Sequence, residues 1–320
     1  MASKDPVIIF GPTGRVGSAT VRAAHEHGAK VFLAMRDTEK AIPGFNSDQE
    51  KECGFERVYA DLMKPETIEE AVAKTGAKRA FIYLMFMAQD HMRSSITALK
   101  SAGIEFVVFL SSYTVPEDLT SLSPDNINFI ALAHGKVESV LQEVYGPAGY
   151  VAVRPGTFAT NSLRWKDMFK NGDIKTPYPE ALFDWISDED IGRVSGSVLA
   201  RGPAVIQENN GKNWILLYGP DVISQGDAIE TIGRVIGKDA RITRLDEEGA
   251  VEFYTTTSHL PEPLARKMAA LLKKRAELGK SDGLEGPKYQ EAVANIQKYG
   301  GKAPTGFKQW VEENKDEFSA

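Results

Sequence analysis

The chain has 320 residues, of which 42% are hydrophobic and 26% are charged, and its formal net charge at pH 7 is −6. This composition is near the average of soluble globular proteins, so it excludes a globally disordered chain. The acidic balance disfavours nucleic acid as a main partner, because proteins that bind phosphate backbones usually carry a basic surface.

The single cysteine, Cys53, excludes an intrachain disulfide and fits a reducing compartment. The N-terminal segment is polar up to Pro6, and only four apolar residues follow before Gly11. Such a run is too short for a signal peptide or a membrane span. We therefore expect a cytoplasmic protein without a membrane partner.

Short apolar runs alternate with helical patterns through the first half of the chain. The runs that predict strands are 7–10, 31–35, 57–60, 80–84, 106–110 and 151–154, and the predicted helices cover 15–27, 65–75, 89–102 and 130–144. Unbroken apolar runs are typical of strands that are covered on both faces. The alternation predicts an α/β fold of the Rossmann type, with a doubly wound parallel sheet.

The pattern loosens after Pro155, where prolines punctuate shorter elements. We predict a Rossmann domain that binds a nucleotide over residues 1–155, followed by the remaining sheet strands and a smaller substrate-covering region over 156–320. Residues 263–278 predict an amphipathic helix that packs on the domain or covers a substrate. Its apolar stripe consists of Leu264, Met268, Leu271 and Leu272.

A glycine-rich loop lies between the first strand and the first helix. Residues 11–17 read GPTGRVG, which is G-x-x-G-x-x-G rather than the commoner G-x-G-x-x-G. Glycines let the backbone approach a pyrophosphate, whose charge is stabilised by the amides at a helix N-terminus. With a strand before it and a helix after it, the loop predicts a dinucleotide site, the alternative being a tight turn without ligand.

The residues after the second and third strands indicate which dinucleotide is bound. Arg36 and Asp37 follow the second strand, where an NAD-specific fold places an acidic residue on the ribose. A guanidinium pairs well with a 2′-phosphate, so NADP(H) is favoured, and Asp37 leaves NAD(H) as the less favoured alternative. Asp61 follows the third strand and either accepts a hydrogen bond from adenine or caps a turn.

Hydroxyl groups and a lysine follow the fifth strand. Ser111, Ser112 and Tyr113 come directly after it, at the edge where doubly wound sheets bind ligands. Lys136 borders the apolar stripe of the next helix, where it either binds a nicotinamide ribose and steadies a developing negative charge or extends to solvent. Lys136, Tyr113 and Ser111 are therefore the candidate catalytic residues.

Two other kinds of site are not predicted. No His, Cys and carboxylate residues have the spacing of metal ligands, so we expect no metal. A nucleophile elbow, which would indicate a serine hydrolase, is not predicted either.

Large apolar residues could form the wall of a pocket for a flat substrate or could belong to the core. They are Met85, Phe86, Met87, Phe158, Trp165, Phe183 and Trp185. As a group they predict a site for an apolar small molecule.

Taken together, these residues resemble the NmrA-like family of atypical short-chain dehydrogenase/reductases. The matching segments are 11–17, Arg36 with Asp37, Asp61 with Leu62, 110–112, Lys136 with Glu138, 154–158 with Asn161, 190–192, 218–220, and 305–307 with Trp310. The resemblance spans nearly the whole chain, and the ordered set is more specific than the loop alone.

The resemblance implies an NADP-binding Rossmann domain with a smaller C-terminal portion that closes over the nicotinamide. The residues that it implies at the pyrophosphate are Gly11, Thr13, Gly14, Arg15 and Val16. It further implies Arg36 at the 2′-phosphate, Lys136 at the nicotinamide ribose, and Pro155, Gly156 and Phe158 beside the nicotinamide.

One departure from the wider superfamily concerns the proton donor. The usual tyrosine lies four residues before the lysine, and here that position is Leu132. Tyr113 could substitute from the neighbouring strand end, or Lys136 or a water could donate the proton.

Three functions are compatible with these residues. The first is an NADPH-dependent reductase of an aromatic or conjugated small molecule, with specialised metabolism as its setting. The second is an NADP-binding redox sensor that regulates a protein partner without turnover. The third is a non-redox cyclase or isomerase that retains bound NADP. Because one fold hosts many functions, the chemistry of the site has to decide.

Overall fold

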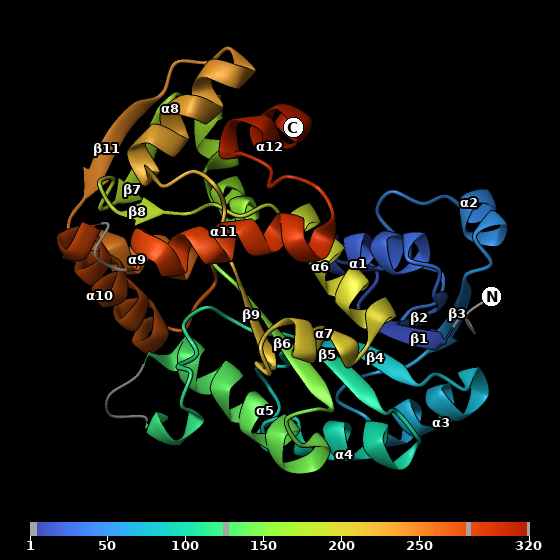
Figure 1. Cartoon of the computed structure of the whole chain (residues 1–320). Helices are drawn as coiled ribbons and strands as arrows, with labels where there is room; N and C mark the ends of the chain where they lie inside the picture. The colour runs from blue at the N-terminus through green and yellow to red at the C-terminus, as the bar shows by residue number, and fades with distance from the viewer. Residues whose placement is uncertain (1–4, 124–127, 280–282, 319–320) are drawn as a thin grey trace. The chain divides into compact units, whose positions relative to one another are not determined.

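The computed structural model of the chain describes residues 5–123, 128–279 and 283–318 (Figure 1). The chain forms two compact units. Unit 1 comprises Met1–Pro155, Asp188–Leu217 and Asn295–Lys302, and unit 2 comprises Gly156–Ser187, Tyr218–Ala294 and Ala303–Ala320. Residues 188–217 return to unit 1 because they supply a helix and a strand to its sheet. In the described ranges, no helix combines the length and apolarity that a membrane crossing requires.

A seven-stranded sheet forms the centre of unit 1, in the order β3-β2-β1-β4-β5-β6-β9. The strands are β1 (Pro6–Phe10), β2 (Lys30–Met35), β3 (Glu56–Tyr59), β4 (Arg79–Tyr83), β5 (Phe106–Leu110), β6 (Tyr150–Pro155) and β9 (Trp214–Leu217). All neighbours pair in parallel. The order reverses between β1 and β4, which confirms the predicted doubly wound sheet and makes this junction the place where such folds bind ligands.

Helices cover both faces of this sheet (Figure 1). One face carries α3 (Pro65–Thr75), α4 (Arg93–Ser101) and α5 (Phe129–Tyr145), whose apolar residues share one core with the strands. The other carries α1 (Arg15–Glu26) and α6 (Asp188–Arg201), with α7 (Ala204–Glu208) following. The short helices α2 (Ser47–Glu52) and η1 (Leu119–Ser121) lie in connections. The helix predicted to begin at residue 89 begins at 93, because His91 and Met92 have φ values of 54° and 62°.

The helix that follows the glycine-rich loop packs unusually closely on α6. A Cβ placed on Gly192 would lie 2.3 Å from the Cβ of Ala19, and one on Gly196 would lie 2.4 Å from the carbonyl oxygen of Thr20. Both distances are shorter than van der Waals contact, so only glycine fits at these two positions of α6. The close crossing fixes α1, and with it the loop at its N-terminus.

Unit 2 has its own small sheets and core. Its elements are η2 (Ala159–Lys170), β7 (Asp173–Pro177), β8 (Leu182–Phe183), β10 (Ile223–Ser224), α8 (Gln225–Ile236), β11 (Arg241–Leu245), α9 (Glu247–Thr257), α10 (Glu262–Leu278), α12 (Phe307–Glu313) and η4 (Lys315–Phe318). Strand β11 pairs with β7 in parallel, and β10 pairs with β8 antiparallel. The residues of α11 (Gly286–Gly300) are divided between the two units.

The predicted amphipathic helix over 263–278 is present as α10, but its buried line is rotated from the predicted stripe. Ala265, Ala269 and Leu272 are buried, whereas Leu264 and Met268 are only half-buried. The small alanines face the core of unit 2 because they allow the helix backbone to approach its neighbours closely. The larger apolar residues then flank that line of contact.

Candidate functional site

The glycine-rich loop is built so that its backbone packs on itself. Gly11 directly follows β1 and has a φ of +70°, and the N–H of Gly14 donates to the carbonyl oxygen of Gly11 over 3.1 Å. A Cβ on Gly17 would lie 2.0 Å from that same oxygen. Two of the three glycines are therefore required, one by its left-handed conformation and one by the close approach of backbone.

The N-terminus of α1 is suited to an anion. Its first turn contains no acidic residue, and the N-cap, Gly14, has no side chain to occupy the amides. The positive end of the helix dipole and the first amides therefore favour a negative ligand. Thr13 and Arg15 are half-buried, Val16 is buried, and a guanidinium nitrogen of Arg15 lies 3.9 Å from a carboxylate oxygen of Asp188.

The acidic and basic residues after β2 and β3 follow the strand ends at the same edge of the sheet as this loop. Arg36 is exposed, and Asp37 accepts a hydrogen bond from the N–H of Glu39 at 3.0 Å. Asp61 accepts one from the N–H of Met63 at 2.9 Å, so it does cap a turn. Its contact with adenine stays a prediction.

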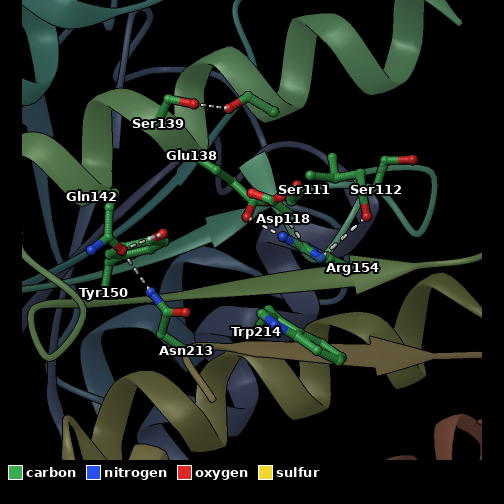
Figure 2. Close-up of polar contacts among 12 residues, drawn as sticks. Ser111, Ser112, Asp118, Glu138, Ser139, Gln142, Tyr150, Arg154, Asn213 and Trp214 are labelled. Carbon is green, nitrogen blue, oxygen red and sulfur yellow. Dashed lines mark hydrogen bonds and ion pairs between the residues drawn. The ribbon is translucent and has the colours of Figure 1, made fainter. Parts of the chain in front are cut away.

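A buried ion pair joins α5 to β6, close to the end of β5 (Figure 2). Arg154 donates from Nε to Oε1 of Glu138 over 3.0 Å and from Nη2 to Oε2 over 2.6 Å. A third donor of Arg154, Nη1, reaches the carbonyl oxygen of Val115 at 3.2 Å. Both side chains are almost completely buried, so removal of one partner would cost about 3–5 kcal/mol.

Ser111 belongs to this buried network. Its hydroxyl donates to Oε1 of Glu138 over 2.5 Å, and the residue is 4% exposed. Because its one O–H is donated to Glu138, Ser111 is part of this buried network in the structure, and its catalytic role stays a prediction. Glu138 and Arg154 are 16 residues apart, so sequence periodicity gave no indication that they pair.

Tyr113 and Pro155 are brought together at the ends of β5 and β6. The N–H of Tyr113 donates to the carbonyl oxygen of Pro155 over 3.0 Å, and the tyrosine is half-buried. Lys136 is half-buried on α5, and none of the ion pairs within the described ranges involves its ammonium. The catalytic roles of Tyr113 and Lys136 stay predictions.

The large apolar residues divide between the two units. In unit 1, Phe86 and Met87 are 65% and 80% exposed, and Met85 is half-buried. The ring of Phe86 meets that of His134 edge-on, with centroids 6.0 Å apart. Burial lowers the pKa of His134, so its ring is neutral and acts as an aromatic neighbour.

In unit 2, the two indoles predicted to line a pocket are part of the core. Trp165 and Trp185 are 0% and 1% exposed, and their ring centroids lie 5.9 Å apart. They therefore do not form a pocket wall, because neither offers a surface to a ligand. Phe183 is half-buried, and the guanidinium of Arg275 lies 4.5 Å from its ring centroid.

The residues that follow β6 surround a buried acid that the sequence did not single out. A Cβ on Gly156 would lie 2.0 Å from Oδ2 of Asp184. The carboxyl group accepts hydrogen bonds from the N–H of Thr157 at 3.0 Å and of Gly219 at 3.2 Å. Burial raises the pKa of Asp184. Gly156 is therefore packed on a carboxyl group, and Phe158, the N-cap of η2, is half-buried just beyond it.

Within residues 5–123, 128–279 and 283–318, no three His, Cys, Asp or Glu side chains gather as metal ligands do. The candidate site thus offers five kinds of group. They are the N-terminus of α1 for an anion, the guanidinium of Arg36, the phenol of Tyr113, the ammonium of Lys136, and the exposed apolar side chains of Phe86 and Met87.

Comparison with known proteins finds a family and relatives that match most of the chain. The model of the NmrA-like family matches residues 3–307. The "nitrogen metabolite regulation-like protein bik4" of Gibberella fujikuroi is 34% identical over 322 residues, covering 96% of this chain and 95% of its own. An NAD(P)H azoreductase of Xenophilus azovorans is 26% identical over 268 residues, covering 83% and 85%.

Solved structures share the fold. An NADPH-dependent quinone oxidoreductase from Escherichia coli, solved with NADPH, superposes with a TM-score of 0.69 at 17% identity. The likeness covers 98% of this chain and all of the other.

Proposed function

The chain belongs to the NmrA-like family, and on that premise we propose that it is an NADPH-dependent reductase of an aromatic or conjugated small molecule. A quinone, an enone or an imine has the required chemistry. The observation that carries this proposal is the tight loop at the N-terminus of α1, where Gly17 leaves no room for a Cβ. The names of two similar proteins, an azoreductase and a quinone oxidoreductase, support the reductase class.

The residues of the loop fit a dinucleotide. Gly11, Thr13, Gly14, Arg15 and Val16 would hold the pyrophosphate, and Arg36 would hold the 2′-phosphate. Arg36 is exposed, while Asp37 is engaged with the backbone of Glu39, which favours NADP(H) over NAD(H). When bound, NADPH supplies a hydride to an activated double bond.

The protein's own part in the reaction is to bind and to polarise. We propose that Lys136 binds the nicotinamide ribose and that Tyr113, held by its backbone bond to Pro155, donates the proton in place of the missing tyrosine at Leu132. The exposed Phe86 and Met87 would contact a flat apolar substrate. A cytoplasmic role in specialised metabolism belongs to the same proposal.

A second candidate function is an NADP-binding regulator without turnover. The relative at 34% identity carries a regulatory name, and Leu132 removes the usual proton donor. A protein partner whose affinity changes with the oxidation state of the nucleotide would favour this candidate.

The test begins with titration calorimetry of the protein with NADPH, NADP⁺ and NADH. We expect Arg36→Ala to weaken NADPH binding about tenfold or more and to change NADH binding little. The reason is that only NADPH has a 2′-phosphate to pair with the guanidinium. Arg241→Ala, which removes a 77%-exposed arginine of unit 2, is the matched control. Absence of binding by any nucleotide would refute the proposal.

Turnover is then measured as loss of the near-ultraviolet absorbance of NADPH with a panel of quinones, enones and imines. Oxidation of NADPH by one class supports the reductase. Tight binding without oxidation across the panel supports the regulator.

A further inference from the structure

Tyr83 lies against the first glycine of the loop. It is the last residue of β4, which pairs with β1 at the point where the strand order reverses. A Cβ on Gly11 would lie only 2.6 Å from Cε1 of Tyr83. The tyrosine ring therefore covers the Cα of Gly11 and leaves no room for a Cβ. Glycine is thus required at residue 11 for two reasons, this contact and the φ of +70°.

The same edge of the sheet continues from Gly11 to Arg36 and Asp61. The N–H of Gly11 donates to the carbonyl oxygen of Ala34 over 3.3 Å, two residues before Arg36. The N–H of Ala60, one residue before Asp61, donates to the carbonyl oxygen of Met35 over 3.1 Å. The ends of β4, β1, β2 and β3 thus form one connected row that carries a phenol, a guanidinium and a carboxylate.

The phenol is a neutral donor under the influence of both charges. Burial raises the pKa of Tyr83, the charge of Arg36 lowers it, and that of Asp61 raises it, with burial the largest effect. The hydroxyl is therefore protonated at neutral pH. In the part of the chain that the structure describes, it forms no hydrogen bond.

A phosphorylated ribose can use both donors of this row. A phosphate monoester has three terminal oxygens, and a guanidinium pairs with two of them in its bidentate geometry. One oxygen is then left for a neutral donor close to the guanidinium. A ribose with a free 2′-hydroxyl has no such oxygen.

We propose that Tyr83 is a specificity-determining residue of the dinucleotide site, whose hydroxyl donates to the 2′-phosphate of NADP(H) beside Arg36. This inference rests on the proposed function, because it concerns the same nucleotide site. The choice of NADP(H) over NAD(H) then depends on Tyr83 at the end of β4 as well as on Arg36 after β2.

Tyr83→Phe tests this role, because it removes the hydroxyl and keeps the ring on Gly11. Calorimetry with 2′,5′-ADP and 5′-AMP isolates the adenosine half, and NADPH and NADH report on the whole nucleotide. We expect Tyr83→Phe to weaken 2′,5′-ADP and NADPH about tenfold and to change 5′-AMP and NADH less than about twofold. Tyr59→Phe, at a 48%-exposed tyrosine of β3, should change none of them.

The combination with Arg36→Ala separates hydrogen bonding from packing. If both groups hold one phosphate, the double variant should lose less affinity for 2′,5′-ADP than the product of the two single losses. Equal weakening of phosphorylated and unphosphorylated ligands by Tyr83→Phe, or no weakening, would overturn the inference while wild-type binding of NADPH leaves the proposed function standing. Wild-type protein that binds none of the four ligands would refute both.

Discussion

The loop before α1 and the segment after β6 both use glycine to allow a very close approach, and they differ in what approaches. At the start of α1, Gly17 makes room for the carbonyl oxygen of Gly11, so backbone packs on backbone. After β6, Gly156 makes room for the carboxyl group of Asp184. A Cβ on Gly219 would lie 1.9 Å from the backbone carbonyl oxygen of Asp184. The first arrangement leaves helix amides for a ligand, whereas the second consumes the amides of Thr157 and Gly219 on the chain's own acid.

The comparison teaches that a required glycine marks a binding site only where the neighbouring amides have no internal acceptor. A buried carboxyl group can occupy the place that an anionic ligand would take. The packing of Gly156 on Asp184 accounts for the glycine, and its implied position beside the nicotinamide stays a prediction.

The largest effect is expected from Gly17→Ala. The added Cβ would lie 2.0 Å from a backbone oxygen, so the loop has to move. We expect NADPH affinity to fall about 100-fold or more, because ligand positioning is lost when groups shift by about an ångström. Gly226→Ala, in unit 2 and outside the loop, is the control, since its Cβ would meet the nearest atom at an ordinary 3.4 Å. Equal losses in both variants, measured by calorimetry, would show that steric closeness at residue 17 is not what builds the site.

A smaller effect, on stability, is expected from Gly156→Ala. Its Cβ would overlap Asp184, and overpacking of this kind costs about 1–3 kcal/mol of unfolding free energy, measured by urea denaturation. Gly226→Ala in the same unit is the control, because its Cβ would meet the nearest atom at 3.4 Å. If Gly156→Ala left stability intact and weakened NADPH instead, the distinction between the two regions would break down.

The smallest effect is a pH dependence due to Asp184. Its pKa is raised in the folded protein above the ordinary 3.8, so between these two values the folded state holds a proton that the unfolded state has released. Wild-type stability should therefore fall as the pH rises above about 4, relative to Asp184→Asn, which cannot titrate. Urea midpoints measured from pH 4 to pH 7 report this difference. A constant gap between the two proteins across that range would show that Asp184 is already ionised in the fold.

The strands and the loop could be predicted because their signals are local. Residues 7–10 and 106–110 are apolar without interruption, as buried parallel strands are, and β1 and β5 cover those residues. The start of α4 could not be predicted, because Met92 is apolar and its left-handed conformation has no counterpart in the pattern.

The site could be predicted only in part. Arg36 directly follows a predicted strand, and no helix is predicted close after it. The sequence therefore indicated that Arg36 lies at the edge of the sheet. Ser111, Glu138 and Arg154 meet from three elements, and no periodicity relates them. The roles of Tyr83 and Asp184 were missed for the same reason, since each depends on a glycine from a distant part of the chain.

The sequence by itself determined the doubly wound sheet, the loop at the start of α1 and the family to which the chain belongs. These follow from short-range patterns of hydrophobicity and glycine, which act through residues a few positions apart. Only the tertiary structure decided that Ser111 serves a buried ion pair, that Trp165 and Trp185 are core, and that Tyr83 covers Gly11. Those outcomes depend on which side chains meet after the strands are ordered, and that ordering brings together residues that no local pattern connects.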